Sequence, residues 1–237
     1  MVLKGYVRIK GLGRCRVLAQ YGPEDEYYVI DQFLQKFARL LKRNVKDDHQ
    51  NVVVCDGSTG GGKSTVMIKL ALAIDPHWTL RENYIYDRSD LERVLREGKT
   101  NRVLIMDEGS VILSAFNSLR KEDKEIVQLF DTMRVYHHTV LVCCPNIYKL
   151  NRTFREDHVQ FRLHCPRKSP VPDCRPRGFV KCYEHESSEW GEDGYYAPMC
   201  TGVFDKLPKG LKMEYDQVKN EHLSRFVREF THEVSTE

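Results

Sequence analysis

The most specific chemical signal in the sequence is a glycine-rich run at residues 57–65, GSTGGGKST. Its first and last glycines and the Lys63-Ser64 pair fit the spacing G-x-x-x-x-G-K-[ST]. Glycines let the backbone wrap closely around phosphate oxygens, and the following helix N-terminus adds amide donors and positive potential. The run therefore predicts a phosphate-binding loop. The expected nucleotide contacts are Gly57, Ser58, Thr59, Gly60, Gly61, Gly62, Lys63, Ser64 and Thr65.

A second motif supplies acidic side chains at the end of an apolar run. Residues 103–106 read VLIM and lead directly into Asp107 and Glu108. We expect Lys63 to reach the β- and γ-phosphates, while the hydroxyl of Ser64 ligates Mg²⁺ and the carboxylate of Asp107 holds it through water. The alternative for Asp107 is a surface acid at the end of a strand. Glu108 is placed to polarise an attacking water, although an acid that merely starts a helix is the alternative.

These motifs favour ATP and Mg²⁺ as cofactors and ATP hydrolysis as the reaction. The chain has no guanine-reading N/TKxD motif, which argues against a GTPase. Small-molecule kinases need no water-activating Glu beside the magnesium-binding Asp, and no acceptor-binding lid is recognisable. A kinase, or a nucleotide switch in which Glu108 points away from the γ-phosphate, remain alternatives.

Further candidate catalytic residues follow the second motif. Asn146 comes after an apolar run and Pro145, where it is either a sensor of the γ-phosphate or a turn-forming residue. Ring-forming motors complete each site with an arginine from a neighbouring subunit. Arg134, Arg152 and Arg155 are candidates for that role, with Arg88 and Arg120 less favoured, and each has a solvated surface arginine as its alternative.

Alternating strand and helix patterns must position these residues. The expected elements are a hairpin at 5–20, a helix at 31–46 with a basic outer face, strands at 52–55, 84–86, 103–106 and 139–144, and helices at 63–74, from a Ser89 cap to 96, and at 122–135. Alternation of this kind predicts a mainly parallel sheet with right-handed crossovers. The predicted fold class is α/β, with a RecA-like P-loop NTPase core and a small β/α C-terminal appendage.

We expect an N-terminal β-arm at 1–30, the core at 31–165 and the appendage at 166–237. The appendage contains a basic, proline-rich loop near 165–178, a β-rich segment at 179–204 and a helix at 213–230. The loop is either a contact for DNA phosphates or a solvated surface. Its cysteines lack the closely paired spacing of structural zinc sites, so separate reduced thiols are expected.

Composition is that of a soluble globular protein. The 237 residues are 41% hydrophobic and 30% charged, with a formal net charge of +3, which by itself argues neither for nor against nucleic acid. The sequence shows neither a secretion signal nor an apolar run long enough for a membrane span. A cytoplasmic location is expected, and Cys55, Cys143 and Cys144 in apolar runs are expected to be small buried hydrophobic residues.

The order of motifs resembles one group of motors. After the phosphate loop come VLIMDE, FDTMR at 130–134, TVLVCCPN at 139–146 and LNRTFRED at 150–157. Over residues 50–165 this is similar to the viral and plasmid branch of the FtsK–HerA ATPases, which includes zonular-occludens-toxin-like and DNA-packaging ATPases. Lys63, Ser64, Asp107 and Glu108 match the catalytic motifs, whereas relatives often carry Gln where Asn146 stands.

The resemblance implies a ring homo-oligomer, usually a hexamer, that moves DNA or drives virion assembly with viral or secretion partner proteins. The expected function is an ATP-hydrolysing motor, an oligomeric DNA translocase or packaging ATPase of a virus or mobile element, in the host cytoplasm if viral. DNA enters by analogy alone. An ATPase of virion assembly or secretion with protein cargo is the alternative.

Overall fold

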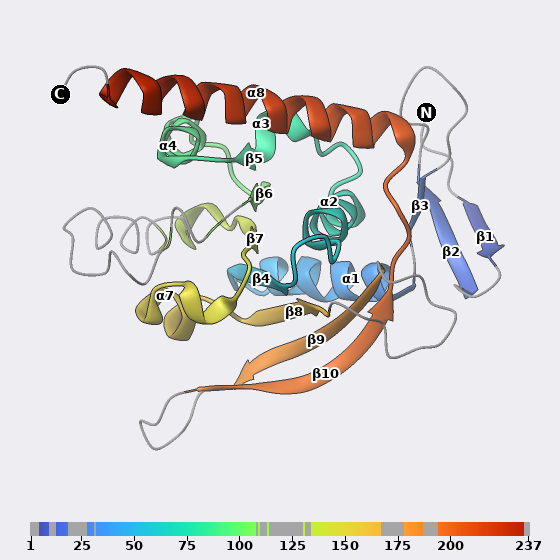
Figure 1. Ribbon diagram of the computed structural model, residues 1–237. Coiled ribbons are helices and arrows are strands. Elements are labelled where there is room, and N and C mark those ends of the chain that lie inside the picture. The colour runs from blue at the N-terminus through green and yellow to red at the C-terminus, as the bar shows by residue number, and fades with distance from the viewer. Residues whose placement is uncertain are drawn as a thin grey trace.

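A seven-stranded sheet forms the centre of the protein (Figure 1). The computed structural model describes residues 5–9, 13–18, 28–30, 32–107, 109, 113, 130, 134–166, 178–186 and 194–234. The sheet strands are β4 (Asn51–Gly57), β5 (Tyr84–Ile85), β6 (Val103–Met106), β7 (Thr139–Cys143), β8 (Phe161–Cys165), β9 (Phe179–Glu186) and β10 (Tyr195–Val203). Their order is β10-β9-β8-β4-β7-β6-β5.

Most of this sheet is parallel. β4 pairs in parallel with both β7 and β8, and β6 pairs in parallel with β5 and β7. Among the described strands of this sheet, the antiparallel pairs are β8–β9 and β9–β10, so β9 runs opposite to the others. The predicted α/β class with a mainly parallel sheet is therefore confirmed. The strand order reverses at β4, between β7 and β8, where an α/β sheet opens a crevice at its carboxyl edge.

Helices cover both faces of the sheet. They are α1 (Gln32–Lys46), α2 (Lys63–Ile74), α3 (Leu80–Asn83), α4 (Arg88–Arg96), α7 (Arg152–Asp157) and α8 (Lys209–Val234), with the short helices η2 (Arg134–Tyr136) and η3 (Ile147–Lys149). Alternate residues of β4 face opposite layers. Val53 and Cys55 pack with α1 and α2, whereas Val52 and Val54 pack with α4 and α7. Burial on both faces explains the continuous apolar run in β4.

Several predicted elements are confirmed within a few residues. Helix α2 has the predicted bounds, the basic face of α1 is exposed, and Cys55, Cys143 and Cys144 are buried. The predicted hairpin corresponds to β1 (Gly5–Ile9) and β2 (Gly13–Leu18), which β3 (Tyr28–Ile30) extends into a separate three-stranded sheet. The helix predicted at 122–135 lies mostly outside the described residues.

The predicted cap of α4 is wrong. Asp87, not Ser89, is the N-cap, because its carboxylate accepts a hydrogen bond from the backbone N–H of Asp90 at 2.9 Å. Ser89 lies in the first turn and donates its hydroxyl to Asp87 at 2.7 Å. Aspartate and serine are both favoured caps, so sequence preference alone does not separate them.

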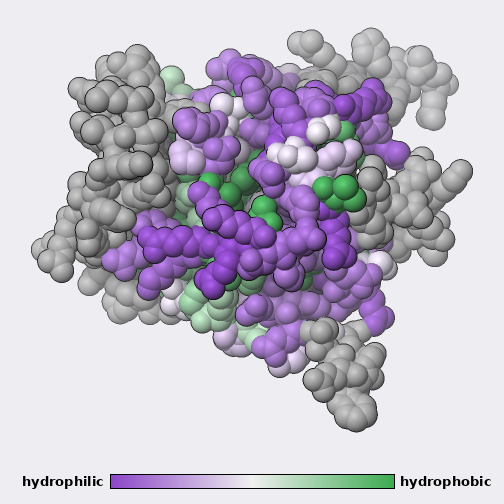
Figure 2. All heavy atoms as spheres, turned by 180° about the vertical axis from the view of Figure 1, so that it is seen from behind, coloured by the Kyte–Doolittle hydropathy of each residue, from purple (hydrophilic) through white to green (hydrophobic). Residues whose placement is uncertain are grey.

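The C-terminal region joins the core closely. β9 and β10 continue the central sheet beyond β8, across the boundary predicted at residue 166. Helix α8 is longer than predicted and runs along the top of the molecule in Figure 1, over α3 and the β5 edge. Seen from behind, the described surface is mostly hydrophilic and shows only small separate hydrophobic areas (Figure 2). Among the described helices, none combines the length and apolar character needed to cross a membrane.

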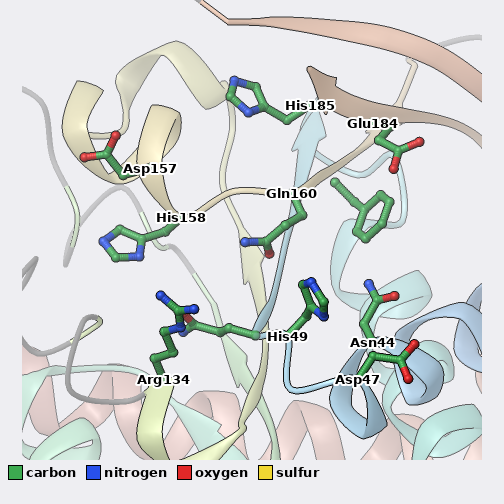
Figure 3. A pocket seen from close by; sticks show the side chains of 11 residues that line it. Asn44, Asp47, His49, Arg134, Asp157, His158, Gln160, Glu184 and His185 are labelled. Atoms are coloured by element: carbon green, nitrogen blue, oxygen red, sulfur yellow. The ribbon is translucent and has the colours of Figure 1, made fainter. Parts of the chain in front are cut away.

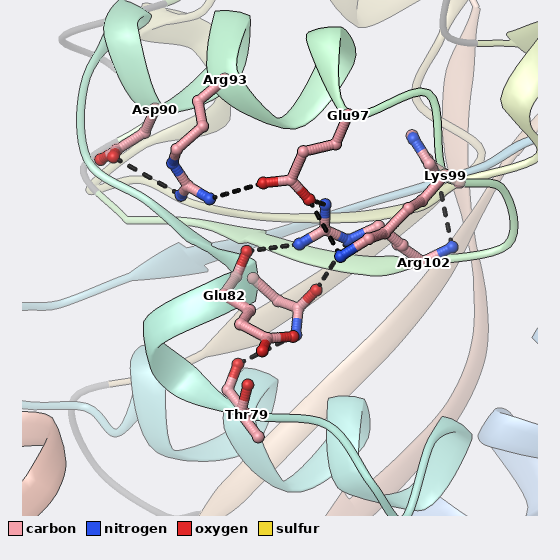
Figure 4. A network of polar contacts seen from close by, with 9 residues as sticks. Thr79, Glu82, Asp90, Arg93, Glu97, Lys99 and Arg102 are labelled. Atoms are coloured by element: carbon pink, nitrogen blue, oxygen red, sulfur yellow. Dashed lines mark hydrogen bonds and ion pairs between the residues drawn. The ribbon is translucent and has the colours of Figure 1, made fainter.

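Arg102 ties together the β5–β6 edge of the sheet (Figure 4). Its guanidinium donates to Asn83 at 3.0 Å and to the backbone oxygen of Glu82, and it pairs with Glu97 at 2.8 Å. The side chain is only 9% exposed. One residue before β6, Arg102 thus fixes α3 and α4 to the strand that leads into Asp107.

Candidate functional site

The predicted phosphate loop connects β4 to α2 and has the backbone that its glycines predict. Gly57 and Gly62 have φ angles of 125° and 96°, a region that side chains with a Cβ rarely adopt. A Cβ on Gly57 would lie 2.1 Å from the carbonyl oxygen of Cys165, and one on Gly62 would lie 2.9 Å from the Phe204 ring. Gly57 is therefore required by close packing against backbone as well as by its backbone angle, and Gly62 is favoured by its backbone angle.

Lys63 and Ser64 open helix α2 beside this loop. The Lys63 ammonium donates to the carbonyl oxygens of Gly57 and Ser58 at 3.0 and 3.2 Å. The Ser64 hydroxyl donates to Oδ1 of Asp107 at 3.3 Å. Asp107 follows β6 and is 3% exposed. The structure thus brings together the serine and the carboxylate that the sequence assigned to Mg²⁺, and these oxygen donors fit a hard divalent cation.

Two residues of α8 also contact Asp107. The Tyr215 hydroxyl and the Lys219 ammonium both donate to Oδ2 of Asp107 at 3.3 Å. Burial alone would lower the pKa of Lys219, but attraction to Asp107 and Tyr215 outweighs it and raises the pKa, so the amine is charged. Sequence analysis missed both residues, because a Tyr and a Lys four positions apart on a helix carry no motif that points to a distant carboxylate.

A cavity of about 500 Å³ opens beside the loop. Residues of the phosphate loop and Asp107 line one side, and the C-terminal segment lines the other. From that segment come Phe204, Asp205, Lys206, Leu207, Lys209, Lys212 and Tyr215. Apolar surface from Phe204 and Leu207 with several lysines suits a ligand that has a flat organic part and anionic groups. The cavity therefore fits a nucleotide with its phosphates on the loop.

Asn146 and Arg155 are engaged elsewhere. The side-chain oxygen of Asn146 accepts a hydrogen bond from the N–H of Tyr148 at 2.9 Å and caps η3. Asn146 is not among the described residues that line the cavity. Arg155 pairs with Glu156 at 3.0 Å, lies 5.2 Å from the Tyr148 ring centroid and is only 13% exposed. The Arg155 side chain is thus held by Glu156 and Tyr148, whereas Asn146 directly follows Pro145, whose carbonyl oxygen accepts a hydrogen bond from the N–H of Gly57 at 3.3 Å.

Arg134 lies at the amino ends of the parallel strands, whereas the phosphate loop lies at their carboxyl ends. It precedes β7, which is parallel to β4, whereas the phosphate loop follows β4. Arg134 is exposed and lines a second cavity, of about 450 Å³, together with His49, His158 and Gln160 (Figure 3). Within one chain it therefore cannot touch a nucleotide bound at the loop.

Arg88 and Arg152 are not among the described residues that line the cavity. Arg88 pairs with Glu92 at 3.1 Å on α4, and Arg152 is exposed at the start of α7. Glu108 and Arg120 lie outside the described residues. The roles assigned to Glu108 and to the arginines stay predictions.

A buried ion pair supports the loop from behind. Asp56, one residue before Gly57, accepts hydrogen bonds from Arg162 at 2.8 and 3.3 Å and contacts the His164 ring nitrogen at 2.8 Å. The Arg162 guanidinium in turn lies within 6 Å of the ring centroids of three tyrosines, Tyr148, Tyr183 and Tyr196. The alternation of polar residues in β8 was the sequence signal that could have indicated this contact.

Comparisons with known proteins give distant structural likenesses. The sequence matches no family profile and no curated protein sequence. A genome packaging NTPase from Sulfolobus turreted icosahedral virus 2, solved with ATP-gammaS, is 12% identical over 63% of this chain and 98% of its own, with a TM-score of 0.40. The N-terminal domain of zonular occludens toxin from Neisseria meningitidis is 12% identical over 69% and 97%, with a TM-score of 0.40.

A DNA polymerase III gamma-subunit-related protein from Thermotoga maritima is 11% identical over 57% of this chain, which spans 46% of that protein, with a TM-score of 0.40. The P-loop fold assignment rests on the sheet order and the loop geometry rather than on these likenesses.

Proposed function

We propose that the protein binds ATP with Mg²⁺ at the phosphate loop and hydrolyses it. The observation that carries this proposal is the position of the Ser64 hydroxyl, 3.3 Å from the Asp107 carboxylate, at the start of the helix that follows a glycine-rich loop. If the glycine-rich run were only a turn, there would be no physical reason for the buried carboxylate of Asp107 to lie beside Ser64.

Each residue then has a defined task. The amides of the loop bind phosphate oxygens, and Lys63 exchanges the carbonyl oxygens of Gly57 and Ser58 for phosphate. Ser64 and Asp107 hold the metal, which when bound neutralises charge on the transferring phosphoryl group. Glu108 is proposed to orient the attacking water. Phe204 and Leu207 line the cavity where the base would lie.

The test is ATP hydrolysis by the purified protein and by three variants. We expect Lys63→Ala to lose nucleotide binding and Asp107→Asn to lose the hydrolysis that added Mg²⁺ supports. Glu108→Gln should bind ATP but hydrolyse it at least about a hundredfold more slowly. Lys46→Met, an exposed change on α1, is the control. Full hydrolysis by Glu108→Gln would remove that residue from the reaction, and tight ATP binding without hydrolysis by the wild type would favour a switch.

We further propose that the active form is a ring that moves DNA, as the resemblance to FtsK–HerA ATPases implies. What supports this step is the run of motifs from the phosphate loop to LNRTFRED. Hydrolysis should therefore rise when double-stranded DNA is added, and the rise should disappear in Glu108→Gln. ATP turnover that neither double- nor single-stranded DNA changes would instead favour a motor with protein cargo.

A further inference from the structure

Helix α8 supplies a cation to the carboxylate that is proposed to hold magnesium. Oδ1 of Asp107 accepts from Ser64, and Oδ2 accepts from both Lys219 and Tyr215, each at 3.3 Å. Lys219 and Tyr215 also contact each other at 3.4 Å. Asp107 is thus a buried carboxylate whose charge is balanced by an ammonium group from a segment more than a hundred residues away.

We propose that Lys219 is the counter-ion of Asp107 in the nucleotide-free protein, and that binding of the metal–nucleotide complex displaces it and loosens this part of α8. The inference rests on the proposed function and adds a coupling between the nucleotide site and the C-terminal helix. It concerns a positioning residue, because Lys219 acts through Asp107.

Lys219 and a divalent cation compete for the same oxygen atoms. A magnesium ion held at Ser64 and Asp107 would place a double positive charge beside an ammonium group that lies 3.3 Å from the same carboxylate. Two like charges at such a separation repel strongly where water is scarce. Asp107 is 3% exposed and Lys219 33% exposed, so the repulsion is only partly screened. Lys219 can move outward into solvent, whereas Asp107 cannot.

Helix α8 is held more firmly at its N-terminal end than in the turns that follow. Its first turns are anchored, because Leu211 is fully buried and the segment before α8 is held by the buried Lys69, which donates to the carbonyl oxygen of Asp205 at 2.9 Å. Farther along, Arg81 and Glu221 pair on the surface at 3.3 Å with both side chains about half exposed. An exposed pair of this kind contributes little. Between these two points Val218 is only 4% exposed, so release of Lys219 would loosen the helix beyond its anchored start rather than detach it.

Two aromatic contacts between α8 and the β5 region would weaken when Lys219 moves. The Tyr215 ring packs edge-on against Tyr84, at 6.0 Å between centroids, and His222 stacks on Tyr86 at 3.9 Å. Both partners belong to β5 or the residue after it, on the sheet edge beside Asp107. Movement of Lys219 disturbs this row because Lys219 lies between Tyr215 and His222 on one helix. Binding and helix docking are then linked, and each must weaken the other by the same factor.

The first experiment measures magnesium affinity. Binding of a fluorescent ADP analogue is titrated with Mg²⁺ for wild type, Lys219→Met, Lys219→Arg and the exposed control Lys46→Met. The methionine variant removes the competing cation, so we expect its apparent magnesium affinity to be about fivefold tighter. Lys219→Arg and Lys46→Met should behave as the wild type does. Unchanged or weaker magnesium affinity in Lys219→Met, with a normal thermal melt, overturns the inference.

The second experiment observes the helix without changing it. Hydrogen exchange of residues 215–222 in the wild type is compared with and without Mg²⁺ and ATPγS, and exchange should become at least about threefold faster in the complex. Bound nucleotide with unchanged or slower exchange there overturns the inference alone. A wild-type protein that binds no nucleotide overturns both the inference and the proposed function.

Discussion

At the scale of single residues, a buried carboxylate, Asp56, directly precedes the phosphate loop. Burial alone would raise the pKa of the Asp56 carboxyl, but hydrogen bonds from His164 and Arg162 outweigh it and hold the pKa below its ordinary value. Asp56 is therefore ionised at neutral pH, and its contribution to stability is lost only as pH falls below about 4.

Removing that carboxylate should destabilise the protein. Asp56→Asn leaves the Arg162 guanidinium, 18% exposed, beside a neutral group, and breaking a buried pair in this way costs about 3 kcal/mol or more. Urea unfolding at pH 7 measures the loss. Asp157→Asn, an exposed change at the end of α7, is the control and should cost less than about 0.5 kcal/mol. Equal stability of the two variants would contradict the assigned role of the pair.

A histidine makes stability depend on pH above that range. His138 is 1% exposed, and its Nδ1 accepts the backbone N–H of Arg102 at 3.2 Å. Burial, followed by the charges of Arg102 and His137, lowers the pKa of His138 to about 4. As pH falls through about 6.5, His138 becomes protonated in the unfolded chain but stays neutral in the folded one. The free energy of unfolding therefore drops by about 2 kcal/mol at pH 5.

The matched variant for this prediction is His138→Asn, whose side-chain oxygen can still accept the Arg102 N–H. Urea unfolding between pH 7.5 and pH 5 should give a flatter stability profile for the variant than for the wild type. Parallel profiles would mean that His138 is not the group that titrates.

At the scale of elements, the β5–β6 edge depends on one arginine. Arg102→Ala removes the bonds to Asn83, Glu82 and Glu97, although Glu97 still pairs with Lys99 and Arg93. We expect a loss of about 2 to 3 kcal/mol. Arg96→Ala, whose side chain is 81% exposed and pairs with Glu92, should cost less than about 0.5 kcal/mol. Thermal unfolding of both variants is the measurement, and similar melting temperatures would contradict this reading of the network.

Elements with a strong local signal were predicted well, and those that depend on distant packing were not. The strand, loop and helix at 51–74 follow from a β-branched run, glycine spacing and apolar periodicity, all of them local. The attachment of β9 and β10 to β8 depends on pairing between segments that the sequence pattern does not link. The same reason explains why Ser64 and Asp107 were found while Tyr215 and Lys219 were missed. The predicted domain boundary at 166 stays a prediction.

At the scale of the whole molecule, Arg134 lies at the amino ends of the parallel strands and the phosphate loop at their carboxyl ends. A ring would bring one edge of each subunit to the site of its neighbour. Lys63→Ala and Arg134→Ala should then each be inactive alone, yet a mixture should recover about a quarter of the wild-type ATPase rate, because random assembly gives that fraction of intact interfaces. Steady-state hydrolysis of premixed variants tests this, and a mixture no more active than either variant would exclude Arg134 as the contributed arginine.

The two ends of the central sheet bear on how copies of the chain can associate. At one end β5 is only two residues long, and at the other β10 contains Pro198, which has no N–H, followed by a register irregularity before Cys200. Short strands, proline and bulges at an edge all discourage pairing with a foreign strand. As far as the described residues show, the sheet is protected against growth by edge-to-edge addition and against the aggregation that such addition begins. Copies of the chain must then associate through side-chain surfaces, and contacts of that kind can form a closed assembly rather than an open-ended one.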